Sequence, residues 1–281
     1  MSFEPDSLPR GFLAAVQSKY ADLLVRHLGL DAPLRAVAEH ALAGGKRLRP
    51  ILTEAMGASL AAPPAAVAHI GVAVEYLHAA SLLLDDLPAM DNARERRGKP
   101  ATHLVFSEAE TILAALALTT RTTMLLLDPA IADAETGRQM ARVAAETVGP
   151  IMACGQAMEF RRGMHELPEQ LVHIHARKTG ALFDLPGKLL SLAAGSTAEI
   201  ARAVATFTSN FGLAYQLIDD LRDRDDPREA HVNLARRAGA EAIRAAAHAA
   251  LDAARDAARF DTTGRLAGCI LWLRGGLDAV A

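Results

Sequence analysis

Residues 72–84, VAVEYLHAASLLL, decide the fold class because they are apolar on more than one side of a helix. Such a helix belongs in the middle of a large bundle or at a subunit interface. Helix-favouring Ala, Leu, Glu and Arg continue in both directions, and strand-like alternation is scarce. We therefore predict one all-α domain over residues 1–281. Its expected helices span about 8–29, 31–42, 47–60, 64–86, 107–127, 134–161, 168–175, 178–194, 197–223, 239–258 and 262–279.

Composition excludes several classes of protein. The 281 residues are 51% hydrophobic and carry a net charge of −3, which argues against a disordered chain and against general binding to nucleic acid. Cys154 and Cys269 are too far apart in sequence to suggest a disulfide framework or a zinc knuckle. The first residues, MSFEPDSLPRGF, have no basic flank followed by an apolar stretch, so we expect no secretory signal there. The apolar run 112–127 is too short to span a bilayer. We expect a soluble, cytoplasmic protein without a transmembrane segment.

An acidic cluster follows the apolar run that ends at Leu84. Asp85 and Asp86 come directly after it, Pro88 disfavours further helix, and Asp91 returns from the loop. Negative charge at a helix C-terminus opposes the helix dipole by about 0.3–1 kcal/mol per group.

A second acidic cluster ends another apolar helix and consists of Asp219, Asp220 and Asp223. Asp219 and Asp223 share one helix face, where like charges repel. One interpretation is a solvated helix end with Asp219–Arg222 and Asp220–Arg224 ion pairs. Two unfavourable clusters are better explained by divalent cations, because Mg²⁺ binds through a few carboxylates together with substrate phosphates.

Separated basic groups complete the pattern. They are GGKRLRP (44–50), Arg96-Arg97-Gly98 and Lys178-Thr179-Gly180. A Gly-rich turn with several cations is suited to binding a diphosphate. Each group alone is more typical of an ordinary surface, so the prediction depends on their combination with the acidic clusters.

These motifs resemble those of the trans-prenyl diphosphate synthases (polyprenyl synthetases), especially the bacterial carotenoid-type geranylgeranyl diphosphate synthases. The similar segments are 44–50, EYLHAASLLLDDLPAMDNARERRGKPATH (75–103), HARKTGALF (175–183) and GLAYQLIDDLRD (212–223). The resemblance implies an isoprenoid-synthase-type helical bundle around a deep central cavity, usually as a homodimer. It also implies Mg²⁺-dependent, head-to-tail condensation of isopentenyl diphosphate with an allylic prenyl diphosphate.

The resemblance also implies a role for each motif residue. Metal ligands, for three Mg²⁺ ions, would be Asp85, Asp86, Asp91, Asp219, Asp220 and Asp223. Contacts to the allylic diphosphate or its metals would come from Arg96, Lys178, Thr179 and Gln216. Isopentenyl diphosphate would bind Lys46, Arg49, His78 and Arg97.

Product length depends on residues that precede Asp85. Ser81 and Ala80 lie four and five residues earlier, about 6–8 Å down the helix axis. Farnesyl-producing relatives carry an aromatic residue here, so the small Ala80 favours geranylgeranyl diphosphate. If Ala80 is merely a helix contact, a farnesyl or a longer-chain product remains open.

Two departures from the family pattern are notable. Residues 224–237 contain no lysine where relatives carry one, although Arg222, Arg224, Arg228 or His231 are available as substitutes. Arginine and lysine do not bind phosphate equivalently, so this segment bears on turnover. Ala115-Leu116 replaces a Gly-Asp pair found in many members.

Three other functions are each consistent with part of the sequence. Glu75-x-x-His78 has the spacing of a di-iron bundle, but a second Glu-x-x-His is lacking. A non-catalytic homologue acting as a partner subunit would be expected to lose an aspartate motif, and both are intact. A cyclase would not need the isopentenyl diphosphate residues.

Overall fold

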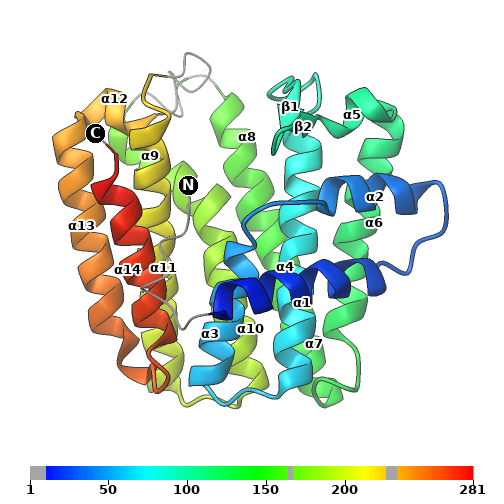
Figure 1. The fold of residues 1–281 in the computed structure, drawn as a ribbon, viewed down its shortest axis with the longest axis horizontal. Helices are drawn as coiled ribbons and strands as arrows, with labels where there is room; N and C mark the ends of the chain where they lie inside the picture. The colour runs from blue at the N-terminus through cyan, green and yellow to red at the C-terminus, as the bar shows by residue number, and fades with distance from the viewer. Residues whose placement is uncertain (1–10, 162, 164–166, 226–232, 281) are drawn as a thin grey trace.

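The computed structural model describes residues 11–161, 163, 167–225 and 233–280, which form a bundle of helices (Figure 1). The first half contains α1 (Phe12–Arg26), α2 (Leu34–Leu42), α3 (Leu48–Ser59), α4 (Pro64–Asp85), β1 (Glu95–Arg96), β2 (Lys99–Pro100), α5 (Thr102–Val105), α6 (Glu108–Leu126) and α7 (Ala134–Glu146). The second half contains the π-helix η1 (Thr147–Ala153), α8 (Cys154–Phe160), α9 (Pro168–His175), the π-helix η2 (Ala176–Gly180), α10 (Ala181–Ala193), α11 (Ala198–Arg222), α12 (Leu234–Ala238), α13 (Ala240–Ala257), the 3-10 helix η3 (Ala258–Phe260) and α14 (Arg265–Asp278). The all-α prediction is confirmed.

Helix α4 is a core helix, as its sequence indicates. Ile70, Val74 and Tyr76 are fully buried, and α6, α3 and α10 pack around the helix. Among the described residues it is the one helix that is long and apolar enough to cross a membrane, yet 67% of that window is buried inside the protein. The same composition that would suit a bilayer serves here to fill the bundle core.

Close packing between α1 and α4 depends on a glycine. The Tyr20 hydroxyl donates to Glu54 (2.9 Å) and to the Val67 carbonyl (3.2 Å). A Cβ on Gly71 would lie 2.2 Å from that hydroxyl oxygen, which is far inside van der Waals contact. Gly71 therefore allows the Tyr20 ring to lie against the α4 backbone.

The short hairpin β1–β2 was not predicted. Arg96 pairs with Lys99, and the two residues between them, Arg97 and Gly98, both have positive φ. Positive φ at both central residues is typical of the tight type I′ turn, which glycine favours. This turn fixes Arg96 and Arg97 beside the C-terminal end of α4.

The predicted helix 134–161 is instead α7, η1 and α8 in succession. Pro150 lies inside η1 and has no backbone N–H to donate to the preceding turn. The helix widens there by π-type bonding and then continues to Phe160. A similar π-helical stretch, η2, carries Lys178 and Thr179 between α9 and α10.

Candidate active site

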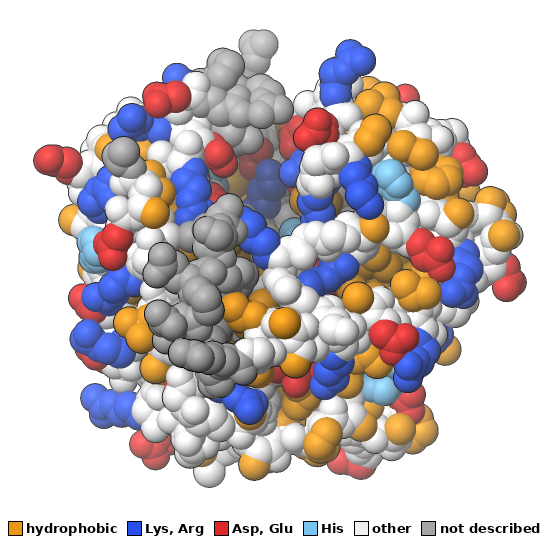
Figure 2. Space-filling view, viewed as in Figure 1, with side chains coloured by type: hydrophobic (Ala, Val, Ile, Leu, Met, Phe, Trp, Pro, Cys, Tyr) orange, Lys and Arg blue, Asp and Glu red, His pale blue; other side chains and the backbone are white. Residues whose placement is uncertain are grey.

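A cavity of about 660 Å³ lies between α4, α8, α10 and α11, and its opening is visible in Figure 2. Most of the predicted site residues line it. These are Arg49, His78, Ala80, Ser81, Asp85, Asp91, Arg96, Lys178, Thr179, Gln216, Asp219, Asp220 and Asp223. Lys46, Asp86 and Arg97 are not among the lining residues. The bundle therefore brings four separate sequence motifs to one cavity.

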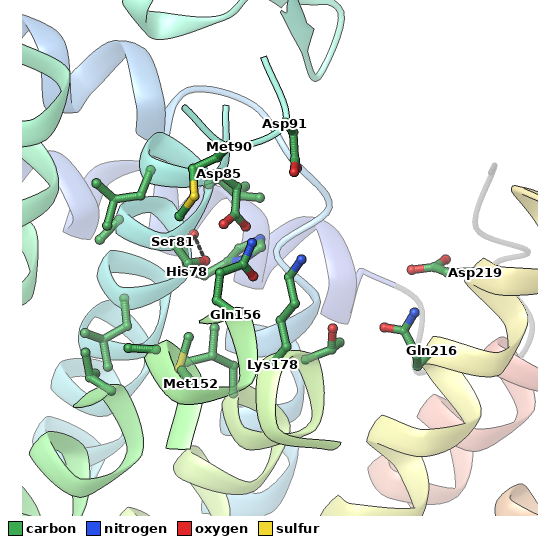
Figure 3. Close-up of a pocket in the computed structure, with 18 of the residues that line it drawn as sticks. His78, Ser81, Asp85, Met90, Asp91, Met152, Gln156, Lys178, Gln216 and Asp219 are labelled. Carbon is green, nitrogen blue, oxygen red and sulfur yellow. Dashed lines mark hydrogen bonds between the residues drawn. The ribbon is translucent and has the colours of Figure 1, made fainter. Parts of the chain in front are cut away.

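The first acidic motif is folded back over the end of α4 by its own loop. The backbone N–H of Asp91 donates to the Asp85 carbonyl (2.9 Å), and that of Ala93 donates to the Asp86 carbonyl (3.1 Å). These bonds satisfy carbonyls that a helix C-terminus leaves without intrahelical partners. The loop thereby returns the Asp91 carboxylate to the side of the cavity where Asp85 lies (Figure 3).

The first two aspartates of this motif have different surroundings. Asp85 faces the cavity, and burial raises its pKa to about 6, with Lys178 opposing the rise and Asp91 adding to it. Asp86 is only 3% exposed and accepts a hydrogen bond from Arg96 Nε (2.9 Å). Asp85 is therefore placed to receive a cation, whereas Asp86 holds the Arg96 guanidinium.

In the second acidic motif both Asp219 and Asp220 line the cavity, but they differ in their hydrogen bonds. Asp219 lines the cavity, and burial raises its pKa to about 6, partly offset by Arg222. Asp220 is 6% exposed and accepts hydrogen bonds from Gln216 Nε2 (3.0 Å) and from the Leu234 backbone N–H (3.2 Å). The Asp220 carboxylate thus ties α11 to the start of α12.

The carboxylates of the two motifs form two acidic banks, one with Asp85 and Asp91 and the other with Asp219. The banks face each other across the cavity, with Lys178 between them (Figure 3). Among the described residues, no three His, Cys, Asp or Glu side chains lie close enough together to hold a metal ion by themselves. The carboxylates are nevertheless the hard oxygen donors that Mg²⁺ prefers, and Mg²⁺ commonly completes its coordination with water and substrate phosphate. The donor set therefore fits cations shared with a bound diphosphate.

Two residues that the sequence analysis did not single out, Glu159 and Gln156, lie on the α8 wall near Lys178, and Glu159 holds the Lys178 ammonium. The ammonium donates to Glu159 (2.9 Å), and Glu159, Asp85 and Asp91 all raise the pKa of Lys178 against the lowering effect of burial. Gln156, one turn before, lines the same wall, and its Nε2 is buried without a hydrogen-bond partner. The sequence contains one feature that could have indicated them: Gln156 and Glu159 are polar residues three positions apart on an otherwise apolar helix segment.

A cationic pocket adjoins the first acidic bank. Arg49 Cζ stacks 4.8 Å from the Phe183 ring centroid, and the Arg97 guanidinium packs on Gly45, where a Cβ would meet it at 2.9 Å. Burial, followed by Arg49 and Arg97, lowers the pKa of His78 well below its usual range. His78 is consequently a neutral imidazole near neutral pH.

This pocket has unused hydrogen-bonding capacity. Arg49 Nε, His78 Nδ1 and Arg97 Nη1 are all buried without a hydrogen-bond partner in the described structure. Buried polar atoms in folded proteins are normally paired, so these three nitrogens are suited to bind a polar ligand such as a diphosphate. Lys46 is exposed nearby and lowers the pKa of Asp219, so it lies within electrostatic range of the site.

Glu75 supplies the counter-charge behind this pocket. It is 3% exposed and accepts a hydrogen bond from Arg47 Nη1 (2.9 Å). That pairing occupies the carboxylate and argues against the di-iron interpretation of Glu75 and His78.

The other end of the cavity is apolar. Ala80 and Ser81 line its α4 wall, and Leu77, Val148, Met152 and Leu182 complete it. The Ser81 hydroxyl donates to the His78 carbonyl (2.9 Å), and the Thr119 hydroxyl donates to the Ala115 carbonyl (2.9 Å). Since both hydroxyls are satisfied within their own helices, this end presents an apolar surface.

The candidate substitutes for the missing lysine lie elsewhere. Arg222 bonds to the Gly276 carbonyl (3.2 Å) of α14 and pairs with Asp219 (3.4 Å), and it does not line the cavity. Arg224 pairs with Asp225 (3.5 Å). Arg228 and His231 fall outside the described residues. Of the unusual pair on α6, Ala115 is buried and Leu116 points outward, 59% exposed.

Comparison with known proteins gives consistent results. The sequence model of the polyprenyl synthetase family matches residues 31–231. The farnesyl diphosphate synthase of Geobacillus stearothermophilus is 34% identical over 220 residues, covering 76% of this chain and 74% of that protein. The geranylgeranyl diphosphate synthase of Pseudescherichia vulneris is 31% identical over 241 residues, covering 82% and 78%. A solved geranyltransferase from Legionella pneumophila superposes with a TM-score of 0.84 at 27% identity, covering 95% of each chain.

Proposed function

The chain belongs to the polyprenyl synthetase family, and on this premise we propose that it is a Mg²⁺-dependent prenyltransferase. It condenses isopentenyl diphosphate with an allylic prenyl diphosphate and gives mainly geranylgeranyl diphosphate. One observation carries the proposal. A single cavity combines two facing acidic banks, the basic side chains of Arg49, Arg96 and Lys178, and an apolar end.

Each part of the cavity matches one part of the reaction. Asp85, Asp91, Asp219 and Asp223 would hold the Mg²⁺ ions, which when bound neutralise charge on the diphosphate. Lys178 and Arg96 stabilise the negative charge that develops as the allylic C–O bond breaks and its electron pair remains on the diphosphate oxygen. Both cations are already positioned, Lys178 by Glu159 and Arg96 by Asp86.

The cationic pocket holds the second substrate. Arg49, His78 and Arg97 donate to the diphosphate of isopentenyl diphosphate, which leaves its carbon–carbon double bond facing the allylic cation. The double bond forms the new carbon–carbon bond, and the proton lost from the isopentenyl unit passes to an oxygen of the released diphosphate. The apolar end excludes water, which would otherwise trap the cation.

Ala80 supports the twenty-carbon product. It lies on the cavity wall about 7.5 Å along the α4 axis from Asp85, at a rise of 1.5 Å per residue, and its methyl group leaves room for a growing tail. The named relatives include both farnesyl and geranylgeranyl synthases, so product size is the property to measure.

The test is incubation with Mg²⁺, labelled isopentenyl diphosphate and, separately, dimethylallyl, geranyl and farnesyl diphosphates. Products are dephosphorylated and sized by chromatography. A dominant twenty-carbon alcohol supports the full proposal, and a fifteen-carbon or much longer alcohol retains the reaction but overturns the product. If the folded protein forms no product with any of the three allylic substrates, the result would favour a non-catalytic partner subunit. The lysine-free residues 224–237 would then be the first segment to test as the cause.

We also propose that two copies associate through α6. One face of this helix exposes a stripe of large apolar side chains, with exposures of 46–61%, consisting of Ile112, Leu113, Leu116, Met124 and Leu127. Apolar stripes of this kind mark interaction surfaces, and the family resemblance favours a second copy as the partner. Light scattering should give a dimer for the wild type and a monomer for Leu116→Asp. A monomeric wild type would contradict this assignment.

A further inference from the structure

One wall of the cavity is formed by η1 and α8. Val148, Met152, Gln156 and Phe160 line it and lie four residues apart, as a single helical face requires. Glu159 on the same helix bonds to Lys178 and raises the pKa of Asp85, so it marks the charged level of the cavity. Residues earlier in this helix therefore lie progressively deeper.

The depth of Met152 can be compared with that of Ala80. Met152 precedes Glu159 by seven residues, about 10 Å along the axis, whereas Ala80 precedes Asp85 by five, about 7.5 Å. In Figure 3 the Met152 side chain lies at the end of the cavity away from Asp85 and Asp91. Met152 and Ala80 thus both line the cavity at levels below its charged groups.

The π-helical stretch gives Met152 this orientation. The buried face of α7 includes Met140, Ala144 and, at its junction with η1, Thr147, and ordinary spacing would continue it to Ile151 and Cys154. A π-turn contains one additional residue, which rotates the residues that follow it relative to α7. Met152 accordingly lines the cavity, whereas Ile151 and Cys154 do not. Pro150, which cannot donate within a regular helix, is the physical reason for the bulge.

The geometry points to Met152 as a residue that sets product length together with Ala80, an inference that rests on the proposed function. Leu77, one turn before Ala80, and Val148, one turn before Met152, also line the cavity. The volume of one side chain at this level therefore decides whether another five-carbon unit fits. Methionine is flexible, so it can yield to a growing tail until the surrounding core resists.

The product assay compares Met152→Ala, Met152→Phe and the double variant Ala80→Phe/Met152→Ala. Met152→Ala should lengthen the main product by one five-carbon unit, and Met152→Phe should shorten it by one. If the two side chains face the same space, Met152→Ala should partly reverse the shortening caused by Ala80→Phe. Met158→Ala, a partly buried α8 residue outside the cavity lining, is the matched control and should keep the wild-type product.

Binding provides a second measurement that does not need turnover. Prenyl thiolodiphosphates of five, fifteen and twenty carbons are titrated in the presence of Mg²⁺. Met152→Phe should weaken the twenty-carbon analogue at least tenfold more than the five-carbon one. An unchanged product in all Met152 variants, or equal weakening of every analogue, would overturn the role of Met152. An inactive wild type would instead overturn the proposed function, and the titrations would still decide the question for Met152.

Discussion

The charged mouth of the cavity and its apolar end are built in different ways. At the mouth, each important side chain has a specific partner, as for Arg96 with Asp86, Lys178 with Glu159, and Asp220 with the Leu234 N–H. At the apolar end, Ser81 and Thr119 bond only within their own helices, and shape is set by packing. The mouth therefore depends on the chemical identity of its residues, and the apolar end depends on their volume.

The largest effect is expected from removing a charge that faces the cavity. Asp85→Asn or Asp219→Asn should lower turnover on the order of 10²–10³-fold, because each loses a carboxylate that stabilises the metal and departing diphosphate. Steady-state assays at saturating Mg²⁺ measure this. Asp86→Asn, which removes a buried partner of Arg96 instead, should cost less turnover but lower the thermal midpoint. Equal losses in turnover for Asp85→Asn and Asp86→Asn would contradict the division of roles.

A smaller effect is expected in the cationic pocket. Arg49→Gln should raise the KM for isopentenyl diphosphate roughly 10–100-fold, since a hydrogen bond to a charged group contributes about 1.5–3 kcal/mol. The KM for the allylic substrate should change little. Arg35→Gln, which breaks an exposed pair with Glu39 on α2, is the control. A matching rise in both KM values would show that Arg49 does not distinguish the two diphosphates.

At the apolar end the expected change is in product and not in rate. Ala80→Phe should shift the main product from twenty to fifteen carbons, because the ring fills the wall position that the methyl group leaves open. Turnover should stay within about tenfold of the wild type, since no group at the mouth is altered. Chromatography of the dephosphorylated products measures this shift, and an unchanged distribution would remove Ala80 from the wall that limits chain length.

The smallest effect concerns stability and pH. The pKa of His78 is lowered in the folded protein. As the pH falls below about 6.5, the His78 side chain therefore binds a proton in the unfolded chain before it does so in the folded protein. The free energy of unfolding decreases over this range. Relative to His78→Gln, the wild type should lose up to about 1.4 kcal/mol per pH unit between pH 6.5 and 5.

Urea unfolding without metal or substrate measures this difference. The comparison between the two proteins is needed because Asp85 and Asp219, whose pKa values are raised, change stability in the opposite direction over the same range. A difference that does not vary with pH would show that folding leaves the pKa of His78 unchanged.

Most of the helices, the two acidic motifs and the basic segments could be predicted from the sequence. These signals are local, because helix periodicity and helix ends are properties of consecutive residues. The burial of α4 was also predictable, since its residues are apolar all round. The resemblance to a known family added roles for the residues of each motif.

The sequence does not show which members of each motif face the cavity, because this depends on how the helices pack. Adjacent aspartates point in different directions on a helix, and only packing determines that Asp86 meets Arg96 while Asp85 meets open space. The contribution of Glu159 and Met152 was hidden for a related reason. They lie more than 60 residues from Asp85, and the π-bulge at Pro150 changes which side of their helix faces inward. Local sequence specifies elements, whereas the surface that elements share depends on how distant segments pack together.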